Sequence, residues 1–98
     1  MHPSKVDRTR LRKLTDLPNV GRETARDLVL LGITSPSQLE GRDPVVLYDA
    51  LCDKTRTRQD PCVLDVLISL TRFMDGDAPQ VWWAYTAERK RMMAALAR

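Results

Sequence analysis

The segment PCVLDVLISLTRFM, residues 61–74, constrains the fold more than any other part of the chain. Its apolar residues cover most of a helix circumference. Asp65, Ser69 and Arg72 fall within about 60° of one another on a helical projection and form one narrow polar stripe. A helix that is apolar on nearly every side must be surrounded by other elements, so the sequence predicts a central helix here. We expect the surrounding elements to pack against this helix through Leu11, Leu14, Leu17, Ala25, Leu28, Val29, Leu47, Ala50 and Leu51.

Helix start signals recur on either side of this segment. Ser35, Asp43 and Asp60 each stand directly before a proline, which pairs a capping side chain with a residue suited to the first helical position. Ser35 and Gln38 also match a capping box. No stretch alternates with the period of a strand, so we expect an all-α fold, a compact bundle of five to six helices. The helices are predicted at 7–15, 22–31, 36–40, 44–54, 61–74 and 79–96, with turns at Gly32, Gly41 and Gly76.

The chain has 98 residues, of which 43% are apolar and 30% charged, a composition typical of one small folded domain. We expect a flexible N-terminus at 1–6, the folded domain at 7–85 and a C-terminal helical extension at 86–98. No apolar run reaches the length of a membrane span, and the N-terminus lacks the pattern of a signal peptide. Two cysteines are too few for a secreted disulfide framework, so we expect a cytoplasmic protein.

Basic residues gather at the two ends of the chain. Residues 1–26 carry a net charge of +4, residues 27–87 of −4 and residues 88–98 of +3. Basic ends around an acidic middle suggest a polyanionic partner, although solvated helix faces produce the same pattern.

The stretch LPNVG, inside the first basic block, carries the main candidate site. Glycine and asparagine adopt the left-handed conformation at low cost, so Asn19 and Gly21 suit a tight reversal. Val20 between them is expected to point inward. The free amides at the start of the next helix, with the positive end of its dipole, then form an anion site beside Arg22 and Arg26.

The longer stretch LTDLPNVGRETARDLVLLGI resembles the helix-hairpin-helix motif, whose turn reads apolar-Pro-Gly-apolar-Gly with an alanine four residues later. Ala25 fills that last place, and Asn19 stands where the motif has its first glycine. The continuation to the Trp-Trp pair resembles the bacterial pathogenicity-locus family of small helix-hairpin-helix proteins and the C-terminal domain of TfoX-type competence regulators. The resemblance implies a SAM-like, pseudo-duplicated domain and, by analogy of fold, DNA binding.

The resemblance also implies roles for single residues. Backbone N–H groups around Val20, Gly21 and Arg22 are expected to contact phosphate. The carbonyls of Thr15, Leu17 and Val20 are expected to hold a monovalent cation in a DNA complex. An interhelical turn with no binding role is the other interpretation of the same residues. The contacts from this turn are then assigned to Pro18, Asn19, Val20, Gly21, Arg22 and Arg26.

The resemblance further implies a second helix pair, formed by the predicted helices on either side of the loop 53–60. This loop has no glycine, so it cannot present its amides in the same way. It carries Lys54, Arg56 and Arg58, whose side chains are expected to contact the phosphates of the second strand. A solvated charged loop without a partner is the alternative.

Catalytic and metal-binding candidates are weaker. Cys52, Cys62 and His2 are too few and too scattered for a closed zinc site. Asp49 and Asp53 share a predicted helix face, but no third carboxylate is in register for a metal-dependent nuclease. The sequence therefore predicts a protein that is not an enzyme and has no metal site or cofactor.

The C-terminal segment combines aromatic and apolar residues. Of Trp82 and Trp83, one is expected to close the core and the other to be partly exposed, where it can pack or stack on a base. Met92, Met93 and Leu96 extend the apolar stripe of this helix. This extension suggests docking on the domain, a homodimer or a protein partner.

Together these observations predict a small non-catalytic module that binds nucleic acid, with duplex DNA preferred, without sequence specificity. The alternative is a protein-interaction or adaptor module that keeps the fold and does not bind DNA. Steep salt dependence of binding to duplex DNA would favour the first, and salt-insensitive association with a protein would favour the second.

Overall fold

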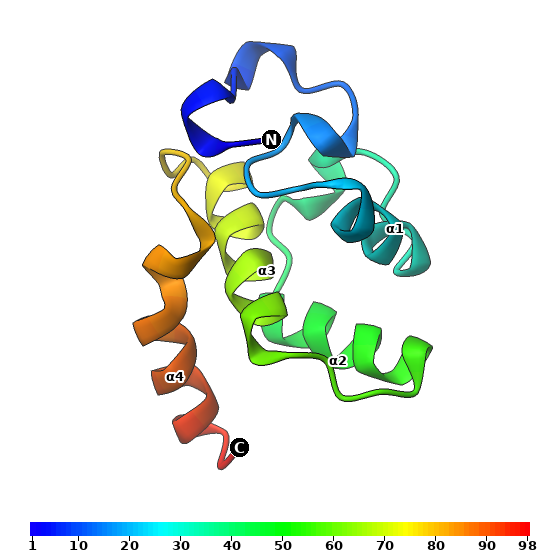
Figure 1. Cartoon of the computed structure of the whole chain (residues 1–98), viewed down its shortest axis with the longest axis vertical. Helices are drawn as coiled ribbons and strands as arrows, with labels where there is room; N and C mark the ends of the chain where they lie inside the picture. The colour runs from blue at the N-terminus through cyan, green and yellow to red at the C-terminus, as the bar shows by residue number, and fades with distance from the viewer.

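The computed structural model describes all residues from Met1 to Arg98 and contains helices and no strand, which confirms the all-α class. The α-helices are α1 (Arg22–Leu30), α2 (Pro44–Thr55), α3 (Pro61–Met74) and α4 (Thr86–Ala95). The 3-10 helices are η1 (Pro3–Lys5), η2 (Arg8–Arg10), η3 (Leu14–Asp16), η4 (Pro36–Leu39) and η5 (Trp82–Tyr85). Figure 1 shows α3 in the middle, with α4 on one side, α1 on the other and α2 across the lower end. None of the helices is long and apolar enough to cross a membrane.

The capping signals place α2 and α3 where the sequence predicts them. Asp43 and Asp60 each accept a hydrogen bond, at 2.9 Å, from the amide two residues further along. Each helix then begins at a proline, as expected from the missing N–H at the first helical position. The predicted capping box of Ser35 and Gln38 is present at the start of η4. Capping residues that are local in the sequence therefore set where α2, α3 and η4 begin.

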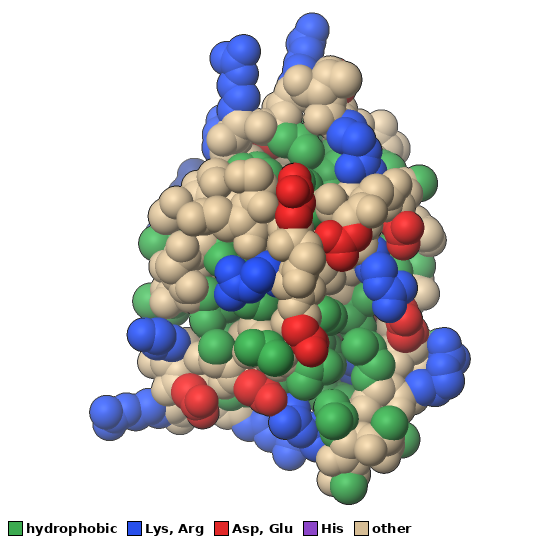
Figure 2. Space-filling model, turned by 180° about the vertical axis from the view of Figure 1, so that it is seen from behind, with side chains coloured by type: hydrophobic (Ala, Val, Ile, Leu, Met, Phe, Trp, Pro, Cys, Tyr) green, Lys and Arg blue, Asp and Glu red, His purple; other side chains and the backbone are tan.

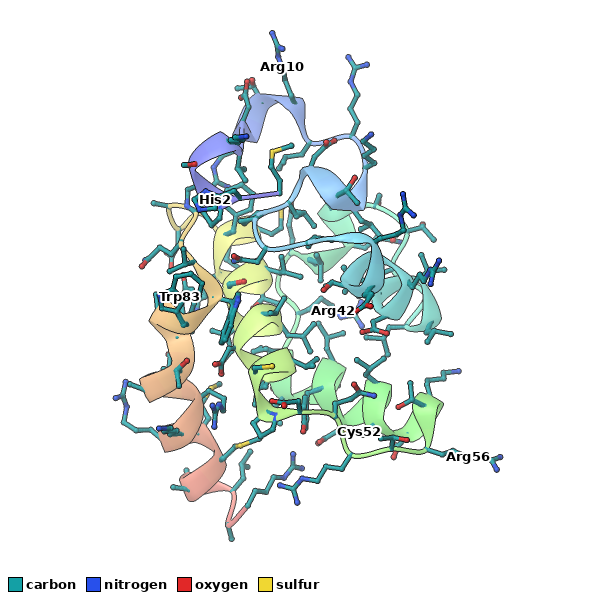
Figure 3. The ribbon with its side chains drawn as sticks, in the orientation of Figure 1. His2, Arg10, Arg42, Cys52, Arg56 and Trp83 are labelled. Carbon is teal, nitrogen blue, oxygen red and sulfur yellow. The ribbon has the colours of Figure 1, made fainter.

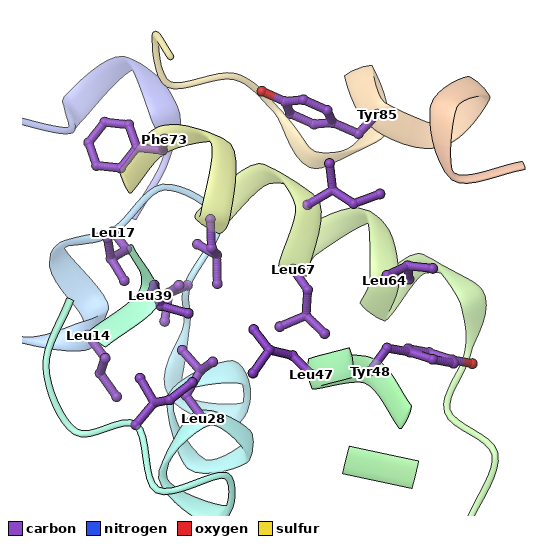
Figure 4. Packing of buried hydrophobic residues seen from close by; sticks show 14 of the residues in the cluster. Leu14, Leu17, Leu28, Leu39, Leu47, Tyr48, Leu64, Leu67, Phe73 and Tyr85 are labelled. Carbon is purple, nitrogen blue, oxygen red and sulfur yellow. The ribbon is translucent and has the colours of Figure 1, made fainter. Parts of the chain in front are cut away.

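The core surrounds α3, and Figure 4 shows how its side chains interlock. The buried residues of α3 include Leu64, Leu67, Ile68, Leu70 and Phe73. The predicted surrounding residues Leu14, Leu17, Leu28, Leu47 and Leu51 are buried, and Leu11 and Ala25 are partly buried against the cluster. Val29 is 54% exposed, so its assignment to the core was wrong. Val29 lies on the solvent-facing side of α1, and the neighbouring Leu28 is the residue of this helix that packs in the core.

The polar stripe of α3 is covered by two other segments. The Asp65 carboxylate has no exposed surface and accepts hydrogen bonds from Thr86 Oγ1 at 2.7 Å and Arg89 Nε at 2.8 Å. The Ser69 hydroxyl accepts a hydrogen bond from Asn19 Nδ2 at 3.0 Å. A buried polar group is stable only when it is paired, so these contacts fix both α4 and the turn before α1 to the central helix.

The helix predicted at 7–15 was wrong, because the segment forms η2 and η3 with extended residues between them. Arg8 is one physical reason. Its guanidinium donates hydrogen bonds to the carbonyls of Phe73 and Asp77 at 2.7 and 2.6 Å and lies 4.0 Å from the centre of the Phe73 ring. There the cation meets the negative end of the α3 dipole and an aromatic face. These tertiary contacts outweigh helix propensity, which is a weak preference.

Two other predicted helices also differ. The segment 36–40 is the 3-10 helix η4, and the segment 79–96 is divided into η5 and the shorter α4. The fold therefore has four α-helices where five to six were expected. The predicted repeat of two matching helix pairs is not matched either, because a 3-10 helix, not an α-helix, precedes the turn at 17–21.

The C-terminal residues pack against the domain. Met93 belongs to the buried core, Met92 packs partly against it, and Leu96 is 48% exposed. The last residue is also held, because the Arg98 guanidinium donates to both Asp49 carboxylate oxygens, at 2.6 and 2.8 Å. Docking on the domain therefore accounts for two of the three apolar residues and leaves Leu96 free.

Candidate nucleic-acid interface

The turn at 17–21 is held from the inside. Asn19 has φ 65°, the left-handed conformation that the sequence predicts for it. Its side-chain amide donates to Ser69 Oγ at 3.0 Å and to the Gln80 carbonyl at 2.8 Å. The amide group therefore turns toward α3 and the segment before η5. An asparagine at this place ties three parts of the chain together.

The other turn residues divide into buried and exposed ones. Val20 is 2% exposed and belongs to the core, as expected for a residue that connects the two elements, and Pro18 is buried as well. Gly21, Arg22 and Arg26 are exposed. Of the residues assigned to this site, these last three therefore offer the most surface to a large partner, and Asn19 is partly exposed.

Gly21 does not adopt the conformation that the sequence suggests. Its φ is −100° and its ψ −167°, an extended conformation that any residue adopts, so the expected positive φ was wrong. A Cβ built on Gly21 would have no heavy atom within 4 Å. Neither backbone strain nor packing therefore requires glycine here. What glycine does provide is an open approach to the backbone at the start of α1.

The start of α1 has no side-chain cap. Gly21 is the N-cap residue, and the first intrahelical bond runs from the Ala25 amide to the Gly21 carbonyl at 3.0 Å. The amides of the first helical turn precede that bond and have no intrahelical partner. They lie at the positive end of the helix dipole, with Arg22 and Arg26 one turn apart beside them. Glu23 in the same turn opposes part of this potential.

The first residues, predicted to be a flexible tail, lie against the same turn. The Met1 α-ammonium donates to the carbonyls of Leu17 at 3.1 Å and Val20 at 2.7 Å. The Met1 carbonyl accepts a hydrogen bond from the backbone N–H of Asn19 at 2.8 Å. Pro3 is buried, which anchors the segment that follows. The amino terminus is thus bound to the turn by both of its polar groups.

This arrangement bears on the predicted cation site. Two of its three expected ligands, the carbonyls of Leu17 and Val20, converge on a single positive charge, the Met1 ammonium. The third, the carbonyl of Thr15, makes no hydrogen bond with it. Burial lowers the pKa of the ammonium, and the nearby Asp16 carboxylate opposes this shift.

Four basic side chains near the amino terminus were not assigned to the site from the sequence. Lys5, Arg10, Arg12 and Lys13 are exposed and line two surface hollows that share Asp16. In Figure 3, Arg10 marks the upper end of the molecule. Figure 2 shows long basic side chains rising from this end and acidic side chains in the middle of the face. The excess of charge in residues 1–26 was the signal that could have identified them.

The loop residues Lys54, Arg56 and Arg58 are exposed at the far end of α2. Arg56 closes that helix in the left-handed conformation, with φ 52°. Figure 3 shows Arg56 projecting away from the molecule, well separated from the upper end where Arg10 lies. The structure therefore does not bring this loop together with the turn at 17–21, and the two form separate basic regions.

The prediction that one C-terminal tryptophan closes the core was wrong, whereas the expected exposure of the other is confirmed. Trp83 is 60% exposed, while Trp82 is half-buried and packs edge-on against it, with ring centres 5.5 Å apart. Tyr85, not a tryptophan, contributes the buried aromatic ring of this segment. Trp83 is therefore a free indole on the outer side of η5, as Figure 3 shows.

Other chemistry has little support. A mostly apolar cavity of about 170 Å³ lies between α1, α2 and α3, with Thr24 and Asp27 among its lining residues. Cys62 also lines it, and burial, aided by Asp60, raises the pKa of its thiol, so the thiol is not an activated nucleophile. No three His, Cys, Asp or Glu side chains come together as a metal site would require.

Comparison with known proteins gives two matches. The model of the family described as "Pathogenicity locus" (Cdd1) matches residues 7–91. The chain is also similar to a protein of Streptomyces lavendulae named "Mitomycin resistance protein McrB", with 46% identity over 81 residues, which are 83% of this chain and 77% of that protein. No solved structure matches the chain.

Proposed function

The chain belongs to the pathogenicity-locus family, and from this premise we propose that it is a non-catalytic module that binds duplex DNA without sequence specificity. The uncapped start of α1 carries this proposal. Free amides, the positive end of a helix dipole and two exposed arginines meet there beside a glycine that nothing in the fold requires. Phosphate is the anion that such a group of amides binds in many proteins.

We further propose that the turn at 17–21 acts as a helix-hairpin-helix element. Pro18, Asn19, Val20, Gly21 and Ala25 keep the order of that motif, and the 3-10 helix η3 takes the place of its first helix. The backbone contacts phosphates, which carry no sequence information, so one duplex sequence should bind about as well as another. A few phosphate contacts give dissociation constants of about 10⁻⁴–10⁻⁶ M at physiological salt.

The two basic regions allow a prediction that depends on the length of the DNA. The molecule is 38 Å long, which corresponds to about 11 base pairs at 3.4 Å each. Changing Arg56 and Arg58 to Glu should flatten the salt dependence of binding to a 16-base-pair duplex, by about 0.9 in the log–log slope for each phosphate that the protein no longer neutralises. Binding to an 8-base-pair duplex should be nearly unchanged. The measurement is fluorescence anisotropy at several salt concentrations.

The matched control changes Arg10 and Arg12 to Glu, at the end that includes the amino terminus. This variant should lose salt dependence on both duplexes, because the turn at 17–21 lies near that end. If the loop variant keeps the wild-type slope on the longer duplex, Lys54, Arg56 and Arg58 are a solvated loop and not part of the interface.

The name of the similar protein suggests a biological setting. We propose that this chain, like its relative, contributes to mitomycin resistance, and that DNA binding is required for the contribution. Expression of the wild-type chain in a sensitive bacterium should raise survival on mitomycin, whereas expression of Gly21→Asp to the same level should not. Equal survival with the wild-type and Gly21→Asp chains would show that resistance does not depend on phosphate binding at the start of α1.

Protein association is the second candidate function, because several large apolar side chains are exposed, including Val29 and Leu30 on α1. Val46, Trp83 and Leu96 are each about half or more exposed. Leu96 lines a surface hollow together with Val45, Met92 and Ala95, and Val46 lies on α2 beside Val45. Salt-insensitive self-association in sedimentation experiments, abolished by Leu96→Lys, would favour this function over DNA binding.

A further inference from the structure

The cavity between α1, α2 and α3 is large enough to hold a small molecule. Its volume is about 170 Å³, and an engineered apolar cavity of about 150 Å³ in another protein binds benzene. Its most deeply buried lining residues are three leucines, one from each helix and each at most 2% exposed: Leu28, Leu51 and Leu67. An apolar body the size of one ring would therefore contact all three helices at once.

The outer lining of the cavity is half-buried, so the cavity is open to solvent on one side. The residues concerned come from α1 with its C-cap and from α3: Thr24, Asp27, Leu31, Cys62, Val63 and Val66. On α1 the lining residues follow at spacings of three and four, which places them on one face of the helix. That face is turned to the cavity, and a ligand can enter from the solvent side without disruption of the core.

Asp27 places a carboxylate without a counter-ion in this outer lining. None of the ion pairs of the protein includes it. Burial raises the pKa of its carboxyl group, and the Glu23 carboxylate one turn earlier raises the pKa further. Both causes oppose the charged form of Asp27. A cation bound in the cavity would counteract both, because it would pair with the carboxylate where water is partly excluded.

The other charges around the cavity also favour a cation. No lysine or arginine lines it, and Arg26, the neighbour of Asp27 in the chain, is exposed and lies outside the lining. On the side of α3, Asp60 and Asp65 both act on Cys62 and raise the pKa of its thiol. An anionic ligand would find no partner here, and a neutral apolar ligand would leave Asp27 without one.

We propose that this cavity binds a small organic cation, with a ring-sized apolar body against Leu28, Leu51 and Leu67 and a protonated amine at the Asp27 carboxylate. The Thr24 hydroxyl, three residues earlier on the same face of α1, provides a second acceptor for the amine. The ligand makes no contact with DNA, so this binding site does not depend on the proposed function.

The test titrates the protein with benzylammonium, benzyl alcohol and phenylacetate, which share one ring and differ in charge. Methylammonium, which has the amine and no ring, is the fourth probe. The methyl ¹³C and ¹H shifts of Leu28, Leu51 and Leu67 report on the cavity. Leu39, which is buried in the core and does not line the cavity, is the internal control.

Benzylammonium should give saturable shifts at the three leucines and bind roughly fivefold to tenfold more tightly than benzyl alcohol, because a hydrogen bond between charged groups is about twice as strong as a neutral one. Phenylacetate should bind most weakly of the three ring compounds, and methylammonium should leave the leucine methyls unmoved. Equal affinities for benzylammonium and benzyl alcohol would overturn the preference for a cation. If none of the ring compounds gives a saturable shift at these leucines, the binding site itself is overturned.

Two variants identify the carboxylate that pairs with the amine. Asp27→Asn keeps the shape of the side chain and removes its charge, so benzylammonium should bind it no better than benzyl alcohol does. Glu23→Gln is the matched control and should change the affinity little, because Glu23 is exposed, lies outside the lining and acts through water. Wild-type affinity for benzylammonium in a folded Asp27→Asn chain would overturn the role of Asp27.

The two cysteines give an independent measurement of where the ligand binds. Cys62 lines the cavity and Cys52 does not. Both are labelled with methyl methanethiosulfonate, which reacts with thiols and not with amines, and the labelled peptides are followed by mass spectrometry. Saturating benzylammonium should slow the labelling of Cys62 and leave that of Cys52 unchanged. An unchanged rate at Cys62, or equal slowing at both cysteines, would overturn the placement of the ligand in the cavity.

Discussion

Gly21→Asp should lower the affinity for duplex DNA at least tenfold while leaving the domain as stable as before or slightly more stable. The new carboxylate would lie at the N-cap of α1, where it can accept hydrogen bonds from the amides of the first turn. Those are the amides that we expect to bind phosphate, so the side chain competes for them and repels the anion. Aspartate caps a helix better than glycine by a few tenths of a kcal/mol. Fluorescence anisotropy and thermal unfolding measure the two effects.

Two matched variants at the same position separate charge from shape. Gly21→Asn adds a neutral cap of the same size, and Gly21→Ala adds only the Cβ, which has open space around it. Both should fold normally. Asparagine should weaken DNA binding less than aspartate, and alanine should weaken it only if a phosphate approaches the backbone closely. Wild-type affinity in a folded Gly21→Asp chain would exclude the start of α1 as the contact.

Arg89→Ala should cost about 3–5 kcal/mol of folding stability, the largest effect that we expect from a single substitution. Arg89 Nε donates to the fully buried Asp65 carboxylate at 2.8 Å, and the arginine side chain is itself only 15% exposed. Its removal leaves a buried charge with Thr86 as its remaining side-chain partner. Because small domains are stable by about 5–15 kcal/mol in total, this loss is a large share of the stability and should lower the urea midpoint markedly.

Urea unfolding followed by circular dichroism measures this destabilisation. Arg91→Ala, on the same helix and exposed, is the matched control and should change stability by less than about 0.5 kcal/mol. Truncation after Glu88 should be at least as damaging as Arg89→Ala, because it also removes the buried Met93. A truncated chain that stays fully folded would show that α4 is dispensable and that Asp65 finds another partner.

The parts of the fold that follow from local chemistry were predictable from the sequence. The Asp-Pro pairs set the starts of α2 and α3, and the apolar circumference of 61–74 identified the central helix. The left-handed conformation of Asn19 followed from its residue type and its place in a short turn. Each of these features depends on atoms that are close together in the sequence.

The features that depend on distant contacts were not predictable. Arg8 breaks the expected first helix by binding carbonyls at the end of α3, more than 60 residues away. In the sequence, Asp65 belongs to the polar stripe of 61–74, and nothing in that pattern shows that Thr86 and Arg89 bury it. The docking of Met1 on the turn has no sequence pattern, because any residue can supply an α-ammonium. The basic side chains beside it were visible only as a local excess of charge.

The central claim, that phosphate binds the backbone at the start of α1, is tested most directly by amide chemical shifts in a titration of the ¹⁵N-labelled chain. An 8-base-pair duplex is added at low salt, and the amide of every residue is followed. We expect the largest shifts at Gly21, Arg22, Glu23 and Thr24, smaller ones in the segment from Lys5 to Lys13, and reversal of all of them at high salt. Shifts confined to the exposed face around Trp83 and Leu96, with the Gly21–Thr24 amides unmoved, would contradict the claim.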